Sequence, residues 1–289
     1  MARSAGAGVI LVTGATGQQG GAVARELLAQ RRTVRAMTRK PDSEAAKALA
    51  TLGAEILKGN LNDPESLKRV VQGVWGVFAV QNAWEAGVEA EEAQGKRIAE
   101  IARQGGVQHF VYTSVGSANR KTGIPHFDSK WRIEETVRGL GFPSHVIIRP
   151  VFFMENFLSP WVKPGIDQGK LQMALKATTV LQMVAVRDVG KHGARAFEQH
   201  AELNRKEIDI AGDAHTMADT AKILSQAAGR TITFEPVPLD IVRAFSEDYA
   251  AMLEWFDRVG YDVDSKRLAA QSGIKPATLA DWAATSFVA

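Results

Sequence analysis

Apolar and polar residues follow two periods along this chain. Short apolar runs such as Val9–Val12 have the length and composition of strands that are buried on both faces. Each run is followed by a longer segment with apolar residues at helical spacing, as in Ala22–Leu28. This pair of a strand pattern and a helix pattern recurs about every 25 residues. Such a recurrence predicts a parallel sheet covered by helices on both faces.

The pattern is regular up to Pro150 and looser beyond it. The strands predicted first are Val9–Val12, Thr33–Thr38, Glu55–Lys58, Gly76–Val80, His109–Thr113 and Ser144–Arg149. The helices predicted between them are Gly17–Gln30, Ser43–Leu52, a helix capped by Asp63, Val88–Gln104 and His126–Arg138. Beyond Pro150 the pattern predicts strands at Leu181–Val186 and Thr231–Pro236, and helices at Val189–Gln199, Thr216–Ala228 and Ser246–Val259. We therefore predict an α/β protein, with a Rossmann-type doubly wound parallel sheet over residues 1–150. Residues 151–289 are expected to form a smaller α+β lobe, with some strands returning to the main sheet.

The turn after the first strand carries a nucleotide-binding pattern. An apolar strand ends in Gly-x-x-Gly-x-x-Gly and opens directly into a helical segment. In such a turn Gly14 permits the tight bend, Gly17 lets the backbone approach phosphates, and Gly20 lets helix and strand pack closely. Unpaired N–H groups and the positive end of the helix dipole then bind the pyrophosphate. The residues predicted to form this dinucleotide site are Gly14, Thr16, Gly17, Gln18, Gln19 and Gly20.

The end of the second strand indicates which dinucleotide binds. NAD-binding chains place an acid here, about 20 residues after the last glycine, to accept hydrogen bonds from the ribose 2′-hydroxyl. This chain has no acid from Val34 through Pro41, and it has Arg39 and Lys40 instead. A guanidinium binds a phosphate through two parallel hydrogen bonds, whereas an acid repels one. The strand end therefore favours NADP(H); the alternative is a basic strand end that meets only solvent.

Composition argues against several other kinds of protein. Of the 289 residues, 45% are hydrophobic and 23% charged, as in ordinary globular proteins. The net charge of +3 comes without a basic stripe interleaved with aromatics, so direct nucleic-acid binding is not expected. Cysteine is absent and the six histidines show no ligand spacing, so neither thiolate chemistry nor a metal site is expected. Residues 1–8 lack an apolar signal region and no apolar run reaches membrane length, so we expect a cytoplasmic protein without a membrane partner.

Candidate ligand-binding residues follow the fourth, fifth and sixth strands, because open α/β sheets bind ligands at the carboxyl ends of their strands. The residues at these ends are Gln81, Asn82, Ser114 and Phe153. His126 and Lys130 lie four residues apart in the helix between strands five and six, so they share one helix face.

Several of these segments together resemble one family. The segments are Gly14–Gly20, Met37–Lys40, Asn82–Glu85, His126–Lys130 and Arg149–Phe157. Their combination resembles the NmrA-like group, which are atypical members of the short-chain dehydrogenase/reductase superfamily. Within that group the chain is most similar to the HSCARG-like NADPH-sensor proteins. The resemblance extends from Val9 to Leu279.

The resemblance implies roles for individual residues. It implies that Arg39 contacts the 2′-phosphate, that Lys130 hydrogen-bonds the nicotinamide ribose, and that Ser114 assists catalysis. Asn60 stands where many relatives place an aspartate against the adenine, and it still offers a donor and an acceptor. His126 occupies the position of the superfamily's catalytic tyrosine, and an imidazole can donate a proton at neutral pH. The alternatives are structural roles for His126 and Ser114 and a solvated side chain for Lys130.

Two functional classes follow from this interpretation. The first is an NADPH-dependent reductase of a small carbonyl or unsaturated compound, with His126, Lys130 and Ser114 as catalytic residues, or a catalytically silent relative of one. The second is a redox sensor that binds NADP(H) and regulates a partner protein, which the loss of the tyrosine favours. Both classes bind NADP(H) and are compatible with a homodimer. The sequence identifies neither the substrate nor the regulatory partner.

Overall fold

The computed structural model describes residues 8–287 of the chain, which form two compact units. The first unit comprises the chain up to Asn119 with His126–Arg149 and Val189–Ile208, and the second comprises Arg120–Pro125, Pro150–Asp188 and the chain from Asp209 onward. Residues 1–7, part of the segment in which the sequence shows no secretion signal, lie outside the described residues. Between residues 8 and 287, no helix is both long enough and apolar enough to cross a membrane.

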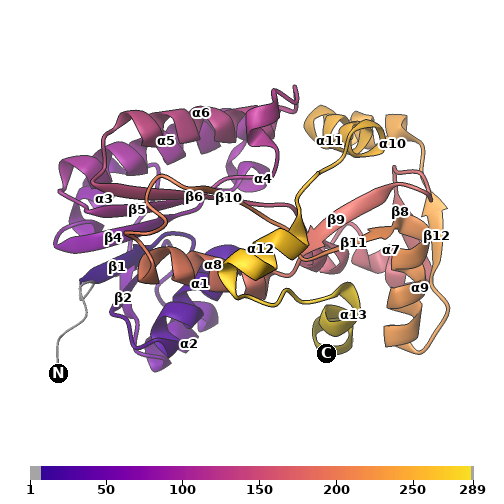
Figure 1. The fold of residues 1–289 in the computed structure, drawn as a ribbon, viewed down its shortest axis with the longest axis horizontal. Helices are drawn as coiled ribbons and strands as arrows, with labels where there is room; N and C mark the ends of the chain where they lie inside the picture. The colour runs from indigo at the N-terminus through magenta and orange to yellow at the C-terminus, as the bar shows by residue number, and fades with distance from the viewer. Residues whose placement is uncertain (1–7, 288–289) are drawn as a thin grey trace. The chain divides into compact units, whose positions relative to one another are not determined.

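The first unit is built on a seven-stranded sheet in the order β10-β6-β5-β4-β1-β2-β3 (Figure 1). Its strands are β1 (Val9–Val12), β2 (Val34–Thr38), β3 (Glu55–Lys58), β4 (Val74–Ala79), β5 (His109–Thr113), β6 (Ser144–Pro150) and β10 (Glu207–Ile210). Each pairing between neighbouring strands from β3 to β6 in this order is parallel. The predicted doubly wound parallel sheet is therefore confirmed, and its strand order reverses between β1 and β4, where such sheets bind ligands.

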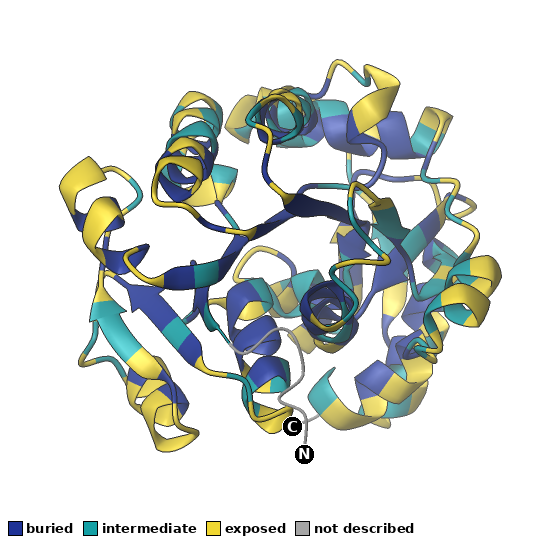
Figure 2. Cartoon of the chain, turned by 60° about the vertical axis from the view of Figure 1, so that its left-hand side comes forward, coloured by how far each residue is buried: buried dark blue, intermediate teal, exposed yellow. Residues whose placement is uncertain are grey.

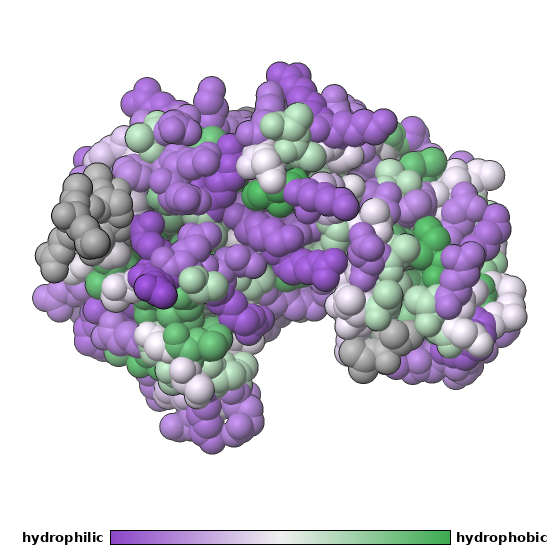
Figure 3. Space-filling view, turned by 60° about the horizontal axis from the view of Figure 1, so that its bottom comes forward, coloured by the Kyte–Doolittle hydropathy of each residue, from purple (hydrophilic) through white to green (hydrophobic). Residues whose placement is uncertain are grey.

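Helices cover both faces of this sheet: α3, α5 and α6 lie on one face, and α1, α2 and α8 on the other (Figure 1). Their bounds are α1 (Gln18–Ala29), α2 (Glu44–Thr51), α3 (Pro64–Val70), α5 (Val88–Gln104), α6 (Pro125–Gly139) and α8 (Val186–Glu198). Every residue of β5 and β6 is buried, which explains why these strands are not alternating patterns of apolar and polar residues. Figure 2 shows the buried strands and the exposed outer faces of the helices. The face drawn in Figure 3 is mainly hydrophilic with smaller hydrophobic areas.

Strand β4 starts and ends earlier than its predicted range, Gly76–Val80. Val74 already pairs with Val9 of β1, so the strand begins there. Val80 leaves the sheet because the hydroxyl of Thr13 accepts a hydrogen bond from its N–H at 2.9 Å and donates to its carbonyl oxygen at 3.1 Å. Thr13 thereby joins the ends of β1 and β4 beside the glycine-rich turn.

The sequence predicted no residue range for three short elements: the one-turn helix α4 (Ala83–Ala86), the 3-10 turn η1 (Ala118–Arg120) and the edge strand β10, which is a strand from residues 151–289 that lies in the main sheet. Each has too few residues to establish a period. Their positions depend on contacts with segments distant in sequence, which a local pattern does not contain.

The second unit contains a three-stranded sheet, β11-β9-β7, and a two-stranded sheet, β12-β8. Its strands are β7 (Phe152–Phe153), β8 (Lys170–Met173), β9 (Val180–Val184), β11 (Asp213–Thr216) and β12 (Thr233–Pro236). Its helices are η2 (Met154–Leu158), α7 (Lys163–Asp167), α9 (Met217–Ala228), α10 (Leu239–Phe245), α11 (Glu247–Arg258), α12 (Ser265–Ser272), α13 (Leu279–Trp282) and the π-helical turn η3 (Ala283–Phe287). Helices α9 and α11 confirm the prediction, whereas β9 ends at Val184 because Val186 already begins α8.

Candidate functional site

The glycine-rich turn joins β1 to α1 with little room for side chains. Gly14 has a φ of +56°, in the left-handed region that glycine adopts readily. A Cβ on Gly14 would lie 2.7 Å from a methyl carbon of Val80, and a Cβ on Gly20 would lie 2.4 Å from the Gly14 carbonyl oxygen. Helix and turn can approach each other this closely because both positions are glycine.

Gly17 differs from these two glycines because only one atom of the described residues would lie within 4 Å of a Cβ there. Its φ of −97° suits any residue, and the nearest atom to a Cβ would be the Gly14 carbonyl oxygen at 3.3 Å. Gly17 is the N-cap of α1, where no side chain accepts from the first-turn N–H groups and no acid lies in the first turn. Such N–H groups at the positive end of a helix dipole can bind a phosphate.

The polar side chains of the turn connect it to two other strand ends. The Thr16 hydroxyl lies 3.3 Å from the hydroxyl of Thr38, the last residue of β2. The side-chain oxygen of Gln19 accepts a hydrogen bond from the hydroxyl of Thr113, the last residue of β5, at 2.7 Å. Gln18 is exposed. The structure therefore brings the ends of β1, β2 and β5 together around the turn.

Exposed cations follow β2. Arg39 forms an ion pair with Glu85 of α4, and the backbone N–H of Lys40 donates to the Thr38 hydroxyl at 3.2 Å. After β3, the side-chain oxygen of Asn60 accepts a hydrogen bond from the Asn62 N–H at 3.0 Å. This oxygen therefore stabilises the local turn. The predicted residues on β2 and β3 thus lie at the same edge of the sheet as the glycine-rich turn.

Two polar side chains at the ends of β4 and β5 are buried without a hydrogen-bond partner among the described residues. They are Gln81, at both its amide nitrogen and its amide oxygen, and Ser114, at its hydroxyl. Asn82 is exposed, and its side-chain oxygen caps α4 by accepting from the Trp84 N–H at 3.1 Å. An unsatisfied buried polar group costs free energy that a ligand or water can recover. Gln81 and Ser114 therefore indicate a polar ligand position at this edge.

Helix α6 carries His126 and Lys130, and both contact the region after β4. The Lys130 ammonium donates to the Glu91 carboxylate of α5 at 2.5 Å, and its side chain is only 13% exposed. The imidazole of His126 is buried, with its centroid 5.1 Å from that of the Trp84 ring. Both side chains thus lie beside the segment that begins with Gln81.

Glu91 is a residue of this region that the sequence analysis missed. It is fully buried, and besides Lys130 it accepts hydrogen bonds from the Ser129 hydroxyl and the Ala83 N–H, each at 3.1 Å. One carboxylate therefore holds α5, α6 and the start of α4 together. A signal was present, because Glu91 lies seven residues before Ile98 on the buried face of α5, where an acid requires a partner.

Tyr112 of β5 does not replace the missing catalytic tyrosine. Its hydroxyl is buried without a hydrogen-bond partner among the described residues. Burial, and then the nearby carboxylates of Glu91 and Glu134, raise the pKa of Tyr112 well above 10. A buried phenol with a raised pKa donates its proton less readily, so Tyr112 offers no replacement and the role of His126 stays a prediction.

Phe153 belongs to the second unit. It forms part of β7, where it pairs with Val184 of β9, and its side chain is half-buried. That Phe153 contacts the cofactor stays a prediction.

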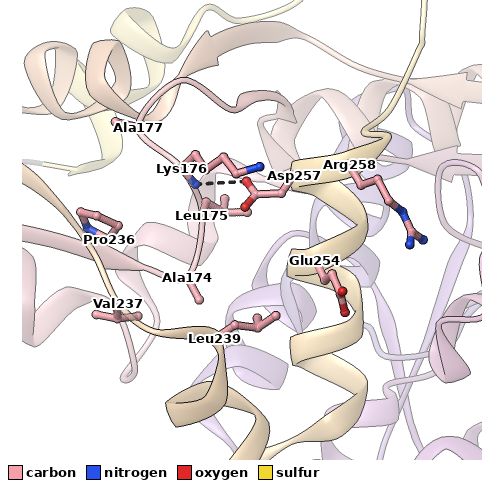
Figure 4. A pocket seen from close by; sticks show the side chains of 10 residues that line it. All are labelled: Ala174, Leu175, Lys176, Ala177, Pro236, Val237, Leu239, Glu254, Asp257 and Arg258. Atoms are coloured by element: carbon pink, nitrogen blue, oxygen red, sulfur yellow. Dashed lines mark hydrogen bonds between the residues drawn. The ribbon is translucent and has the colours of Figure 1, made fainter.

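The second unit also contains a cavity of about 680 Å³ (Figure 4). Leu175, Val237 and Leu239 contribute apolar surface to it. Asp257 of α11 projects toward the loop after β8 and accepts a hydrogen bond from the Lys176 N–H at 3.1 Å. None of the site residues predicted from the sequence is among those that line this cavity.

The strand order and the glycine-rich turn define a Rossmann-type α/β protein. Comparison with known families refines this class. The chain belongs to the NmrA-like family, whose model matches residues 7–283.

One curated relative carries the same family domain. The chain is 38% identical over 167 residues to an NmrA-like family domain-containing oxidoreductase, FrzB, from Cladobotryum sp.. The match covers 54% of this chain and 50% of that protein, so the chain spans about half the length of this curated relative.

Two solved structures share the fold over nearly the whole chain. The NADPH-dependent quinone oxidoreductase QOR2 from Escherichia coli, complexed with NADPH, has a TM-score of 0.80 at 23% identity, over 96% of this chain and 99% of that one. Nmra, a negative transcriptional regulator in complex with NAD, has a TM-score of 0.80 at 18% identity, over 98% of this chain and 96% of that one. At these identities the similarity shows the fold alone.

Proposed function

We propose that this chain binds NADP(H) at the carboxyl edge of the seven-stranded sheet and acts as an NADPH-dependent reductase. The observation that carries the proposal is a glycine turn that leaves the N-terminus of α1 without a side-chain cap, at the same sheet edge as a β2 end that presents Arg39 and Lys40. The turn suits a pyrophosphate, and the two cations suit a 2′-phosphate. One structure with this fold is a complex with NADPH and another is a complex with NAD, so the fold alone does not indicate the dinucleotide. The charge at the end of β2 is the feature of this chain that favours NADP(H).

Other residues of the first unit fit the remainder of the dinucleotide. The unsatisfied amide of Gln81 offers a donor and an acceptor, which complement the carboxamide of a nicotinamide. Lys130 uses one ammonium hydrogen on Glu91 and has two more for a ribose hydroxyl. Asn60 is proposed to contact the adenine through its amide nitrogen. When bound, NADPH supplies a hydride.

The cofactor preference is testable by direct titration. NADPH is expected to bind at least about tenfold more tightly than NADH, because each charge-assisted hydrogen bond contributes roughly 1.5–3 kcal/mol. Arg39→Asp should remove most of this preference, since it removes the guanidinium and adds a repulsive charge. Calorimetric titration of both proteins with both dinucleotides measures the change. Equal affinities of the unmodified chain for NADPH and NADH would contradict the proposed specificity.

For reduction of a small carbonyl or unsaturated compound, His126 or a bound water is proposed to supply the proton. Lys130 orients the ribose, and Ser114 has an unsatisfied hydroxyl that can bond a substrate oxygen. The second candidate function is an NADP(H)-dependent regulator of a partner protein, as in the HSCARG-like group that the sequence resembles. The observation that favours it is His126 at the tyrosine position, combined with a Tyr112 that is unsuited to replace the acid.

Substitutions in α6 separate the two candidate functions. If the chain is a reductase, His126→Ala should lower turnover by about 100-fold or more, the range typical of a lost general acid. Lys130→Ala should weaken NADPH binding in either case. NADPH oxidation is measured against a panel of carbonyl and unsaturated compounds. Activity that His126→Ala leaves unchanged excludes His126 as the acid, and no turnover of any compound, together with an NADPH-dependent change in proteolysis or association state, supports the regulator.

The organisation around this site is part of the proposal. Residues 1–150 are proposed to supply the cofactor-binding residues of the first unit, and the part of residues 151–289 that belongs to the second unit, including Phe153, a lobe for a small molecule or a partner protein. A cytoplasmic location suits a chain without cysteine, and a homodimer is the association state to test by gel filtration with and without NADPH.

A further inference from the structure

Helix α4 places a carboxylate on the cation proposed to receive the 2′-phosphate. The guanidinium of Arg39 donates to Glu85. No acid occurs from Val34 through Pro41, so the end of β2 itself provides none. Glu85 comes instead from the segment after β4, 46 residues farther along the chain. The tertiary structure thus places a carboxylate at the end of β2, where the local sequence contains none.

The ion pair between Arg39 and Glu85 can separate easily, so another anion can bind Arg39. Their side chains are 61% and 54% exposed, and exposed ion pairs hold their partners weakly. Helix α4 is a single turn with no buried residue, and it ends at Gly87, which has a φ of +85° and no atom within 4 Å of a Cβ position. Glu85 can therefore leave Arg39 without disturbing buried structure, unlike Glu91, which is fully buried on Lys130.

We infer that Glu85 competes with the 2′-phosphate of NADP(H) for Arg39, and so determines how strongly this chain prefers NADP(H) over NAD(H). The inference rests on the proposed cofactor site. A phosphate that approaches the guanidinium meets a carboxylate of the same sign already bound to it, and the repulsion between the two anions weakens phosphate binding unless Glu85 turns away. NAD(H) carries a neutral hydroxyl at this position, which the carboxylate does not repel. Glu85 therefore lowers the affinity for the phosphorylated dinucleotide selectively.

Removing the charge of Glu85 tests the competition. Glu85→Gln is expected to bind NADPH about 3- to 10-fold more tightly, the size expected when one exposed ion pair and one repulsive charge are lost. Its affinity for NADH should not rise, because NADH carries no 2′-phosphate for the Glu85 carboxylate to repel. The same contrast is expected between 2′,5′-ADP and 5′-AMP, which isolates the 2′-phosphate. Glu89→Gln is the matched control, since Glu89 is exposed nearby and the change removes the same charge.

The Arg39→Gln background shows whether the effect passes through Arg39. Adding Glu85→Gln to Arg39→Gln should give little further gain in NADPH affinity, and the inference is supported if the gain of the single variant is largely lost. An unchanged or weaker NADPH affinity in Glu85→Gln overturns the inference, as does an equal gain for NADH or for Glu89→Gln. Each of these results leaves NADP(H) binding itself intact. If the unmodified chain binds neither NADPH nor NADH, the proposed function fails and the inference fails with it.

Discussion

Replacing Gly17 with valine is expected to lower the affinity for NADPH by at least about 100-fold, because losing two charge-assisted hydrogen bonds costs roughly 3 kcal/mol or more. The branched side chain would stand beside the N-terminus of α1, where the pyrophosphate is proposed to bind. The fold should survive with a small shift of the turn, since the φ of −97° at Gly17 suits valine and a Cβ there would lie 3.3 Å from the Gly14 carbonyl oxygen. Calorimetry measures the affinity, and circular dichroism measures the fold.

Gly139→Val is the control for this substitution. Gly139 ends α6, with no atom within 4 Å of its Cβ position, so the same chemical change is made away from the turn. Its NADPH affinity should match that of the unmodified chain. A folded Gly17→Val protein with unchanged affinity would mean that the phosphates bind elsewhere, and the proposed cofactor site would then be wrong.

Replacing Glu91 with glutamine is expected to lower the free energy of unfolding by about 3 kcal/mol, the lower end of the cost of breaking a buried ion pair. The ammonium of Lys130 would lose its counter-ion while remaining mostly buried, and Ser129 and Ala83 would compete for one acceptor. Urea denaturation monitored by tryptophan fluorescence measures the change, provided that the slope with urea stays constant.

A double-mutant cycle distinguishes the ion pair from packing. Glu91→Gln combined with Lys130→Met should destabilise the chain by at least about 1 kcal/mol less than the sum of the single changes, because the second substitution removes the stranded charge. Glu65→Gln is the control; it breaks the exposed pair with Lys68 and should cost less than about 1 kcal/mol. Strict additivity of Glu91→Gln and Lys130→Met would show that the two charges do not depend on each other.

Local sequence predicted the regular elements of the first unit closely. The bounds of β1, β3, β5 and α5 are those expected from the pattern of apolar residues. These segments are informative because a strand buried on both faces must be apolar throughout, and a helix on a sheet must be apolar along one stripe. Asp63 caps α3 as predicted, since its carboxylate accepts from first-turn N–H groups within three residues.

The same reasoning did less well where structure depends on distant partners. The end of β4 was placed at Val80, but the hydroxyl of Thr13 withdraws Val80 from the sheet. The two-residue strand β7 exists only through its pairing with β9. Neither contact leaves a periodic trace in the local sequence, because each is made by a single residue or pair across a long loop.

By itself, the sequence determined the class of sheet, the glycine turn and the charge at the end of β2. These features are local: a left-handed turn needs glycine, and the absence of an acid between Val34 and Pro41 can be read directly. Only the tertiary structure decided the partners of the two cations proposed to hold the cofactor. Arg39 meets Glu85 and Lys130 meets Glu91, across 46 and 39 residues of chain. Ion pairs of this kind depend on where folding places the helices after β4, and helical spacing within one segment contains no information about that.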